Sequence, residues 1–246
     1  GWLCVAAYLL WLMTENSAAL NFSRAAGIWF FLLPIVLTVS HRMIPFFSSR
    51  VLDNYVMVRP FWMLWLMLAC IVAHGGLQWL EMTAYQWMAD FPLALCALYL
   101  SYRWGFLRSF SVSLLAVLHF SFLWLGLSMT LYAVQSLVYM LSGNLLFGLA
   151  PLHALAIGFF ASMVLAMASR VTIGHSGRPL ELDHTTWLLF LGFQSAAVLR
   201  ILADLIPAMA PMLYVAAGLA WLGCFVLWAA KYAPIYWRQR VDGKPG

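Results

Sequence analysis

The stretch FSVSLLAVLHFSFLWLGLSMTLYAV, residues 110–134, decides the fold class of this chain. It runs for 25 residues without an Asp, Glu, Lys or Arg, and ~20 mostly apolar residues suffice for a helix to cross a bilayer. Apolar and polar residues do not alternate along it, which disfavours a membrane β-barrel. The stretch therefore predicts a membrane-spanning α-helix.

The rest of the chain has the same character. Its 246 residues are 65% hydrophobic and 9% charged, whereas soluble domains carry ~25% charged residues. A soluble fold of this size cannot hide so much apolar surface from water, but lipid can solvate it. Nucleic-acid binding is disfavoured, because the net charge of +5 comes from basic residues scattered between apolar runs. The cysteines lie singly and form no C-x-x-C pair, so neither a zinc site nor a disulfide framework is predicted.

Working outward from residues 110–134, we predict one transmembrane domain over residues 1–246, an all-α polytopic bundle with about eight spans. The first span is short and is taken as truncated, so we expect the sequence to be the C-terminal two-thirds of a longer protein. The longest polar connection is predicted between Ser40 and Arg59. The predicted spans are Trp2–Met13, Ala25–Val39, Phe61–Leu80, Tyr85–Tyr102, Phe110–Val134, Pro151 to just before Arg170, Thr186–Leu205 and Met212–Ala230.

Lys and Arg residues gather in alternate loops. Eleven of the 13 lie in one set of loops and in the C-terminal tail, whereas the opposite loops hold only Arg24. Because Lys and Arg are enriched in cytoplasmic loops, this pattern predicts that both chain ends are cytoplasmic. Arg200 is the one basic residue within a span. The eleven are Arg42, Arg50, Arg59, Arg103, Arg108, Arg170, Arg178, Lys231, Arg238, Arg240 and Lys244.

Three of the six histidines fall within predicted spans, where a polar side chain is costly. At ~1.5 Å per residue, His74 lies roughly 20 Å and His119 roughly 14 Å from the cytoplasmic ends of their helices, and His153 lies near the outer start of its span. His74 and His153 thus share the outer half, where facing imidazoles are the usual axial ligands of a membrane haem. Interhelical hydrogen bonding is the alternative role, and His119 could also bind copper or lie on a proton path. The others, His41, His175 and His184, are expected at the cytoplasmic surface.

Arg200 and Asp204 lie four residues apart, on one face of the seventh span. Arg200 is roughly 22 Å along its helix, in the same outer layer as His74 and His153. We predict an intramembrane ion pair between Arg200 and Asp204, and the alternative is that Arg200 holds a haem propionate. In the sixth span small residues recur every four positions, which predicts close approach of another helix. They are Ala154, Gly158, Ser162 and Ala166.

The most distinctive local string is Gly174-His175-Ser176-Gly177-Arg178-Pro179-Leu180. Two glycines and a proline impose a specific backbone path. The string matches neither a dinucleotide fingerprint nor a P-loop. It predicts a rigid cytoplasmic turn, and the alternative is an anion site formed by Arg178 and backbone N–H groups.

Several strings together resemble the NnrS-type membrane proteins. The run Arg170-Val171-Thr172-Ile173-Gly174-His175-Ser176-Gly177-Arg178-Pro179-Leu180, with His153-Ala154-Leu155 before it, resembles the family signature. Arg42-Met43-Ile44-Pro45-Phe46-Phe47 is similar to an earlier family motif, and Arg200 stands where the family has an arginine. The endings Tyr232-Ala233-Pro234-Ile235 and Arg240-Val241-Asp242-Gly243-Lys244-Pro245-Gly246 resemble the family's C-terminus.

The resemblance implies an all-helical protein of the bacterial inner membrane that contains haem and copper and is linked to nitric oxide metabolism and nitrosative stress. It implies haem ligation by at least one of His74, His119 and His153. The family's N-terminal helix reading roughly His-Ala-His-Glu-Met does not occur in this sequence. We therefore expect a haem- and copper-binding membrane protein that handles nitric oxide or a metal–nitrosyl species, with no redox partner indicated. The alternatives are a transporter or a structural subunit without a redox cofactor.

Overall fold

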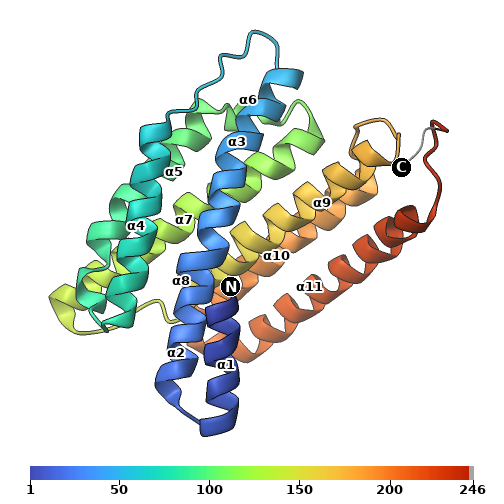
Figure 1. The fold of residues 1–246 in the computed structure, drawn as a ribbon. Helices are drawn as coiled ribbons and strands as arrows, with labels where there is room; N and C mark the ends of the chain where they lie inside the picture. Colours follow the sequence, from blue (N-terminus) through green and yellow to red (C-terminus); the bar gives the residue numbers. More distant parts are fainter. Residues whose placement is uncertain (244–246) are drawn as a thin grey trace.

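The computed structural model describes residues 1–243, and this range is built of helices without strands (Figure 1). Six of its helical segments are long and apolar enough to cross a membrane, two fewer than the eight predicted. The other two predicted spans form shorter helices, α1 (Trp2–Thr14) and α5 (Trp87–Arg103), of 13 and 17 residues. The all-α polytopic bundle is confirmed.

Two of the six long segments change helix type along their length. The first joins α2 (Ser17–Ala25), the π-helical turn η1 (Ala26–Leu32) and α3 (Leu33–Val51), and the second joins α8 (Ala150–His153), the π-helical turn η3 (Ala154–Ala161) and α9 (Ser162–His175). Such π turns occur frequently at functional sites. The other elements are α4 (Phe61–Trp79), η2 (Thr83–Tyr85), α6 (Phe106–Ser109), α7 (Ser113–Ser142), α10 (His184–Leu205), η4 (Pro207–Met209), α11 (Ala210–Tyr232) and η5 (Ala233–Trp237).

The central helix is α7, which contains residues 113–134 of the uncharged stretch. Of the residues in its most apolar part, 72% are buried inside the bundle, whereas the corresponding share for the segment that contains α11 is 11%. The interior polar side chains of α7 are mostly serines that bond locally or to a neighbouring helix. Ser121 donates to the Val117 carbonyl, and Ser128 donates to the Pro151 carbonyl on α8. An uncharged sequence whose hydroxyls are satisfied can therefore lie in the middle of the bundle.

The close helix approach predicted for the small-residue stripe is confirmed. A Cβ atom at Gly158 would lie 2.5 Å from the Trp124 ring of α7, so only glycine allows this contact. The Trp124 indole donates to Gln194 of α10, and Gln194 donates to the Ser162 hydroxyl, at 2.7 and 2.8 Å. Small residues and a buried amide thus join α7, η3, α9 and α10.

The polar connection predicted from Ser40 to Arg59 is wrong over its first half, because α3 continues to Val51. Ile44 and Pro45 are buried on this extension, and their packing outweighs the polar composition. As a consequence, His41 lies in the interior with 1% of its surface exposed, and not at the cytoplasmic surface as predicted.

The two ends of the bundle differ in their content of Lys and Arg. The loops after α3, α5 and α9 and the C-terminal tail lie together at one end, which we call the basic end, and the remaining turns lie at the opposite end. The basic end carries the loops in which the sequence concentrates Lys and Arg. Lys244 lies outside the described residues.

Candidate functional site

His74 of α4 is held by a carboxylate of α5. Its Nδ1 atom lies 2.5 Å from Oδ1 of Asp90, and the two side chains are 1% and 0% exposed. The Trp29 ring of η1 lies against the imidazole with centroids 3.7 Å apart, and the Tyr132 ring of α7 lies 5.1 Å away. Side chains from η1, α5 and α7 therefore fix the orientation of this imidazole on α4.

The second ring nitrogen of His74 is available. Its Nε2 atom is buried and has no hydrogen-bond partner among the described residues. A carboxylate at Nδ1 favours the tautomer with the proton on Nδ1, which leaves a lone pair on Nε2. Metal-ligating histidines almost always make such a second bond, and it raises their basicity. The geometry therefore suits His74 to bind a metal through Nε2.

One cavity adjoins this histidine, and a second cavity shares part of its lining. His74 lines the first, of about 290 Å³, and Arg24 and Glu81 line the second, of about 480 Å³. Cofactor and ligand pockets typically measure ~300–1,000 Å³. The volume of the cavity beside the imidazole is close to the lower end of this range. Both cavities are also lined by Gln78, Tyr132 and Leu152.

His153 lies in a different polar cluster and is bonded through both ring nitrogens. Its Nδ1 lies 2.7 Å from Oδ2 of Asp204, and its Nε2 lies 2.9 Å from Nη2 of Arg200. Tyr214 of α11 donates to the other oxygen of Asp204, and its ring lies 4.5 Å from the Arg200 guanidinium. Neither nitrogen of His153 is therefore free for a metal in this arrangement.

The direct ion pair predicted between Arg200 and Asp204 is wrong, since it is not among the salt bridges of residues 1–243. The two residues share a face of α10, as their spacing requires. The imidazole of His153, brought by α8, bonds to both side chains and links them instead. A sequence spacing cannot reveal a third side chain that arrives from another helix.

His119 and the predicted outer layer complete the histidine set. Nε2 of His119 lies 2.9 Å from the Ser48 hydroxyl on α3, which matches the interhelical hydrogen bond named as the alternative. Within the described part of the chain, the rings of His74 and His153 do not form a contacting pair. The structure therefore separates the two histidines into the His74–Asp90 and His153–Asp204 clusters.

Two functional candidates were missed in the sequence. One is Asp90, which precedes the apolar core of its span. Positions 74 and 90 are equally distant in sequence from residue 82, which lies in the α4–α5 turn. An antiparallel pair of helices therefore brings the two residues to the same depth in the bundle. That symmetry is the signal that identifies the pair. His41 is the other candidate, since its Nε2 is also buried without a partner, beside the Phe61 and Trp104 rings.

Residues 42–47, residues 170–180 and the C-terminal tail pack against one another at the basic end. The guanidinium of Arg170 lies 3.9 Å from the centre of the Phe47 ring, and Arg170 is only 8% exposed. The Thr172 hydroxyl lies 2.7 Å from the hydroxyl of Tyr236. Three separate segments, 42–47, 170–180 and the tail, thus form one contact region.

The glycine-rich loop docks on the tail. The backbone N–H of Val241 donates to the Ser176 carbonyl at 3.1 Å. Gly177 has φ of +73°, and a Cβ atom there would lie 2.7 Å from the Asp242 carboxyl carbon. Of the other motif residues, Gly174, His175 and Pro179 are exposed, and Arg178 is half-buried with Nη1 unpartnered.

A family model described as NnrS protein matches residues 1–240. The chain belongs to the NnrS family. No curated protein and no solved structure matches it. The match covers residues 42–47, residues 170–180 and the tail up to Arg240, and these segments contact one another in this NnrS chain.

NnrS membership implies haem and copper, and the residues present can be tested against each. The buried, unpartnered Nε2 of His74 and the cavity that His74 lines fit a haem with a histidine ligand. For copper, the described residues contain no group of three or more His, Cys, Asp or Glu side chains placed to hold an ion. We therefore assign no copper ligands in this NnrS chain.

Proposed function

We propose that this NnrS-family chain is a haem-binding protein of the bacterial inner membrane that handles nitric oxide and protects against nitrosative stress. The proposal takes His74 as an iron ligand. The observation that carries it is the buried, unpartnered Nε2 of His74, whose partner nitrogen is bonded to Asp90. The family match supports the link to nitric oxide.

Each neighbour of His74 has a distinct role in the proposal. Asp90 accepts a hydrogen bond from the Nδ1–H group and so fixes the tautomer that leaves the lone pair on Nε2. Trp29 covers one face of the imidazole and excludes water from it. Arg24 lines the second cavity together with Glu81, and its guanidinium is the group there that can pair with a carboxylate of the cofactor. When bound, haem supplies an iron centre that takes up diatomic ligands such as nitric oxide.

The proposed roles of Arg200 and His153 follow from their existing bonds. Arg200 already bonds to His153 and lies over the Tyr214 ring, and His153 is held by Asp204. We therefore give this cluster a structural role in joining α8, α10 and α11, and we do not assign it to the propionates.

The proposed orientation puts the basic end, with the C-terminal tail, in the cytoplasm. Short loops rich in Lys and Arg remain on that side of bacterial membranes. The gathering of these loops at one end of the bundle supports this orientation (Figure 1). The cavity that His74 lines and the second cavity then lie in the half of the bundle away from the cytoplasm.

An optical spectrum tests the function. The protein, purified in detergent from a haem-producing host, should show a Soret band that shifts when nitric oxide is added. His74→Ala should lose most of the band, because the variant lacks the lone pair at Nε2. His153→Ala and His119→Ala should retain it and serve as matched controls, since both replace buried histidines already engaged in hydrogen bonds.

Two results would overturn the proposal. One is a wild-type protein without a Soret band when haem is supplied. The other is a band that survives His74→Ala but disappears in the His153 or His119 variant, which would move the ligand to another cluster. Size-exclusion chromatography of each variant confirms that band loss does not follow from unfolding.

A further inference from the structure

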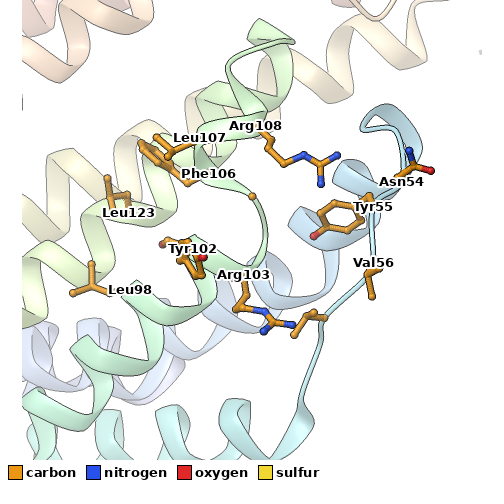
Figure 2. Close-up of a pocket in the computed structure, with 13 residues that line it drawn as sticks. Asn54, Tyr55, Val56, Leu98, Tyr102, Arg103, Phe106, Leu107, Arg108 and Leu123 are labelled. Carbon is orange, nitrogen blue, oxygen red and sulfur yellow. The ribbon is translucent and has the colours of Figure 1, made fainter.

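A cavity of about 680 Å³ lies at the basic end, between the loop after α3 and the α5–α6 turn (Figure 2). Its lining comes from residues 54–56, Val58, the C-terminal part of α5, Gly105, α6 and Leu123 of α7. None of the histidines contributes to it. It is therefore separate from the His74 site, and its chemistry needs its own explanation.

The two sides of this cavity differ in chemistry (Figure 2). Arg103, Arg108 and Tyr55 stand on one side, with the Tyr55 hydroxyl directed inward. The 13 lining residues include two arginines and no Asp or Glu, so the charge on this side is positive. The opposite side is apolar and is formed by Leu98, Phe106, Leu107 and Leu123.

The two arginines are held in place but not neutralised. Arg108 donates through Nη2 to the carbonyl of Asp53, which leaves most of its five N–H donors available. The Arg103 guanidinium lies 5.9 Å from the centre of the Tyr99 ring. Neither arginine takes part in a salt bridge within residues 1–243. A cavity with two uncompensated cations favours an anionic occupant.

We infer that this cavity binds an anionic phospholipid of the leaflet at the basic end, with its phosphate between Arg103 and Arg108. The apolar side requires an occupant with an apolar part, and the acyl chain lies along Leu98 and Leu123. In a chain that spans a membrane, the amphiphile available at this depth is a lipid. Basic pockets between helices on the cytoplasmic side are known to hold acidic lipid head groups.

Lipid titration of the purified chain tests the inference. Protein stripped of lipid in detergent is titrated with phosphatidylglycerol, with phosphatidylcholine and with inorganic phosphate, and the bound species are counted by native mass spectrometry. Phosphatidylglycerol should fill one saturable site at least tenfold more tightly than phosphatidylcholine. The Arg103→Gln/Arg108→Gln variant should weaken it roughly thirtyfold, since each cation near an acidic lipid contributes about 1 kcal/mol.

A matched control and a second variant keep the test decisive. Arg50→Gln changes a basic residue at the same end that does not line the cavity, and should leave the affinity within about twofold. Leu107→Glu places a carboxylate on an exposed position of the apolar side, so it should weaken phosphatidylglycerol binding even if the arginine variants fail to fold. Equal binding of the two lipids would overturn the inference, as would full retention in the double arginine or Leu107→Glu variant. Displacement of the lipid by an equal concentration of inorganic phosphate would also overturn it, because the site would then recognise a free anion.

Discussion

Nδ1 of His74 and Oδ1 of Asp90 lie 2.5 Å apart, on two antiparallel helices joined by the turn around residue 82. Both side chains are almost fully buried. Removing one member of such a buried pair leaves the other with an unpaired polar group, which costs several kcal/mol. The bond therefore couples α4 to α5. It also orients the His74 imidazole, whose Nε2 has no hydrogen-bond partner among the described residues.

We expect His74→Ala and Asp90→Ala each to lower the free energy of unfolding by about 3 kcal/mol. The double variant should cost less than the two single changes together, by about 1–3 kcal/mol, because no partner is then left unpaired. Denaturant unfolding in detergent micelles measures the free energies of this double-mutant cycle. The variant Asp53→Ala, at an exposed position, is the control. Additive effects would show that the two residues act independently. Asp90→Asn should also weaken haem binding by about 10–100-fold.

Gly158→Ala should lower the free energy of unfolding by about 1–3 kcal/mol. The new methyl group would lie 2.5 Å from the Trp124 ring, and buried overpacking carries a cost of that size. Gly218→Ala on α11 is the matched control, since a Cβ there meets no atom within 4 Å. The control should be neutral or slightly stabilising, because alanine favours a helix over glycine. Equal thermal stability of the two variants would contradict the close α7–η3 approach.

Asp183, the N-cap of α10, should make stability depend on pH in the acid range. Burial would raise its pKa, but hydrogen bonds from Lys231 and Thr186 outweigh that effect and lower the pKa to about 2. A lowered pKa means that the stabilisation is complete above the unfolded value of ~3.9 and disappears as the pH falls toward 2. The Asp183 side chain is 56% exposed, so the effect should stay below about 1 kcal/mol.

The variant Asp183→Asn separates charge from capping, because asparagine is an equally good N-cap. At pH 7 this variant should be slightly less stable than the wild type. Thermal unfolding should show that the difference in stability between the two proteins disappears by about pH 2. Asp53→Asn at the same end is the control. A difference that stays constant with pH would assign the stabilisation to capping alone.

Gly177→Ala should release the tail from the glycine-rich loop. A backbone φ of +73° is unfavourable for alanine, and the alanine methyl group would clash with the Asp242 carboxyl group. A cost of about 1 kcal/mol raises the population of the detached tail roughly fivefold. Tryptic cleavage after Arg238 or Arg240 should accelerate by that factor, since proteolysis follows the open population. Gly174→Ala, a helical position with its nearest contact at 3.4 Å, should leave the cleavage rate unchanged.

Composition and hydropathy determined the fold class and the division of the chain into helices. Uncharged runs such as residues 110–134 can be solvated by lipid only as helices, since every backbone polar group must be satisfied within the segment. The same reasoning identified the alternation of loops rich in Lys and Arg with loops poor in them, and the order of the helices places the two kinds of loop at opposite ends of the bundle. It misplaced helix ends such as Val51, because polar residues near the surface continue a helix when its buried face continues.

Tertiary structure alone decided which polar groups meet. His74, His119 and His153 are equivalent in the sequence as histidines within apolar spans, and their neighbours distinguish them. Asp90 and Trp29 hold His74 and leave Nε2 free, whereas Ser48 engages His119, and Arg200 and Asp204 engage His153. The reason is physical: spacing along one helix fixes which residues share its face, but hydrogen bonds in the interior depend on the side chains that other helices bring to the same depth.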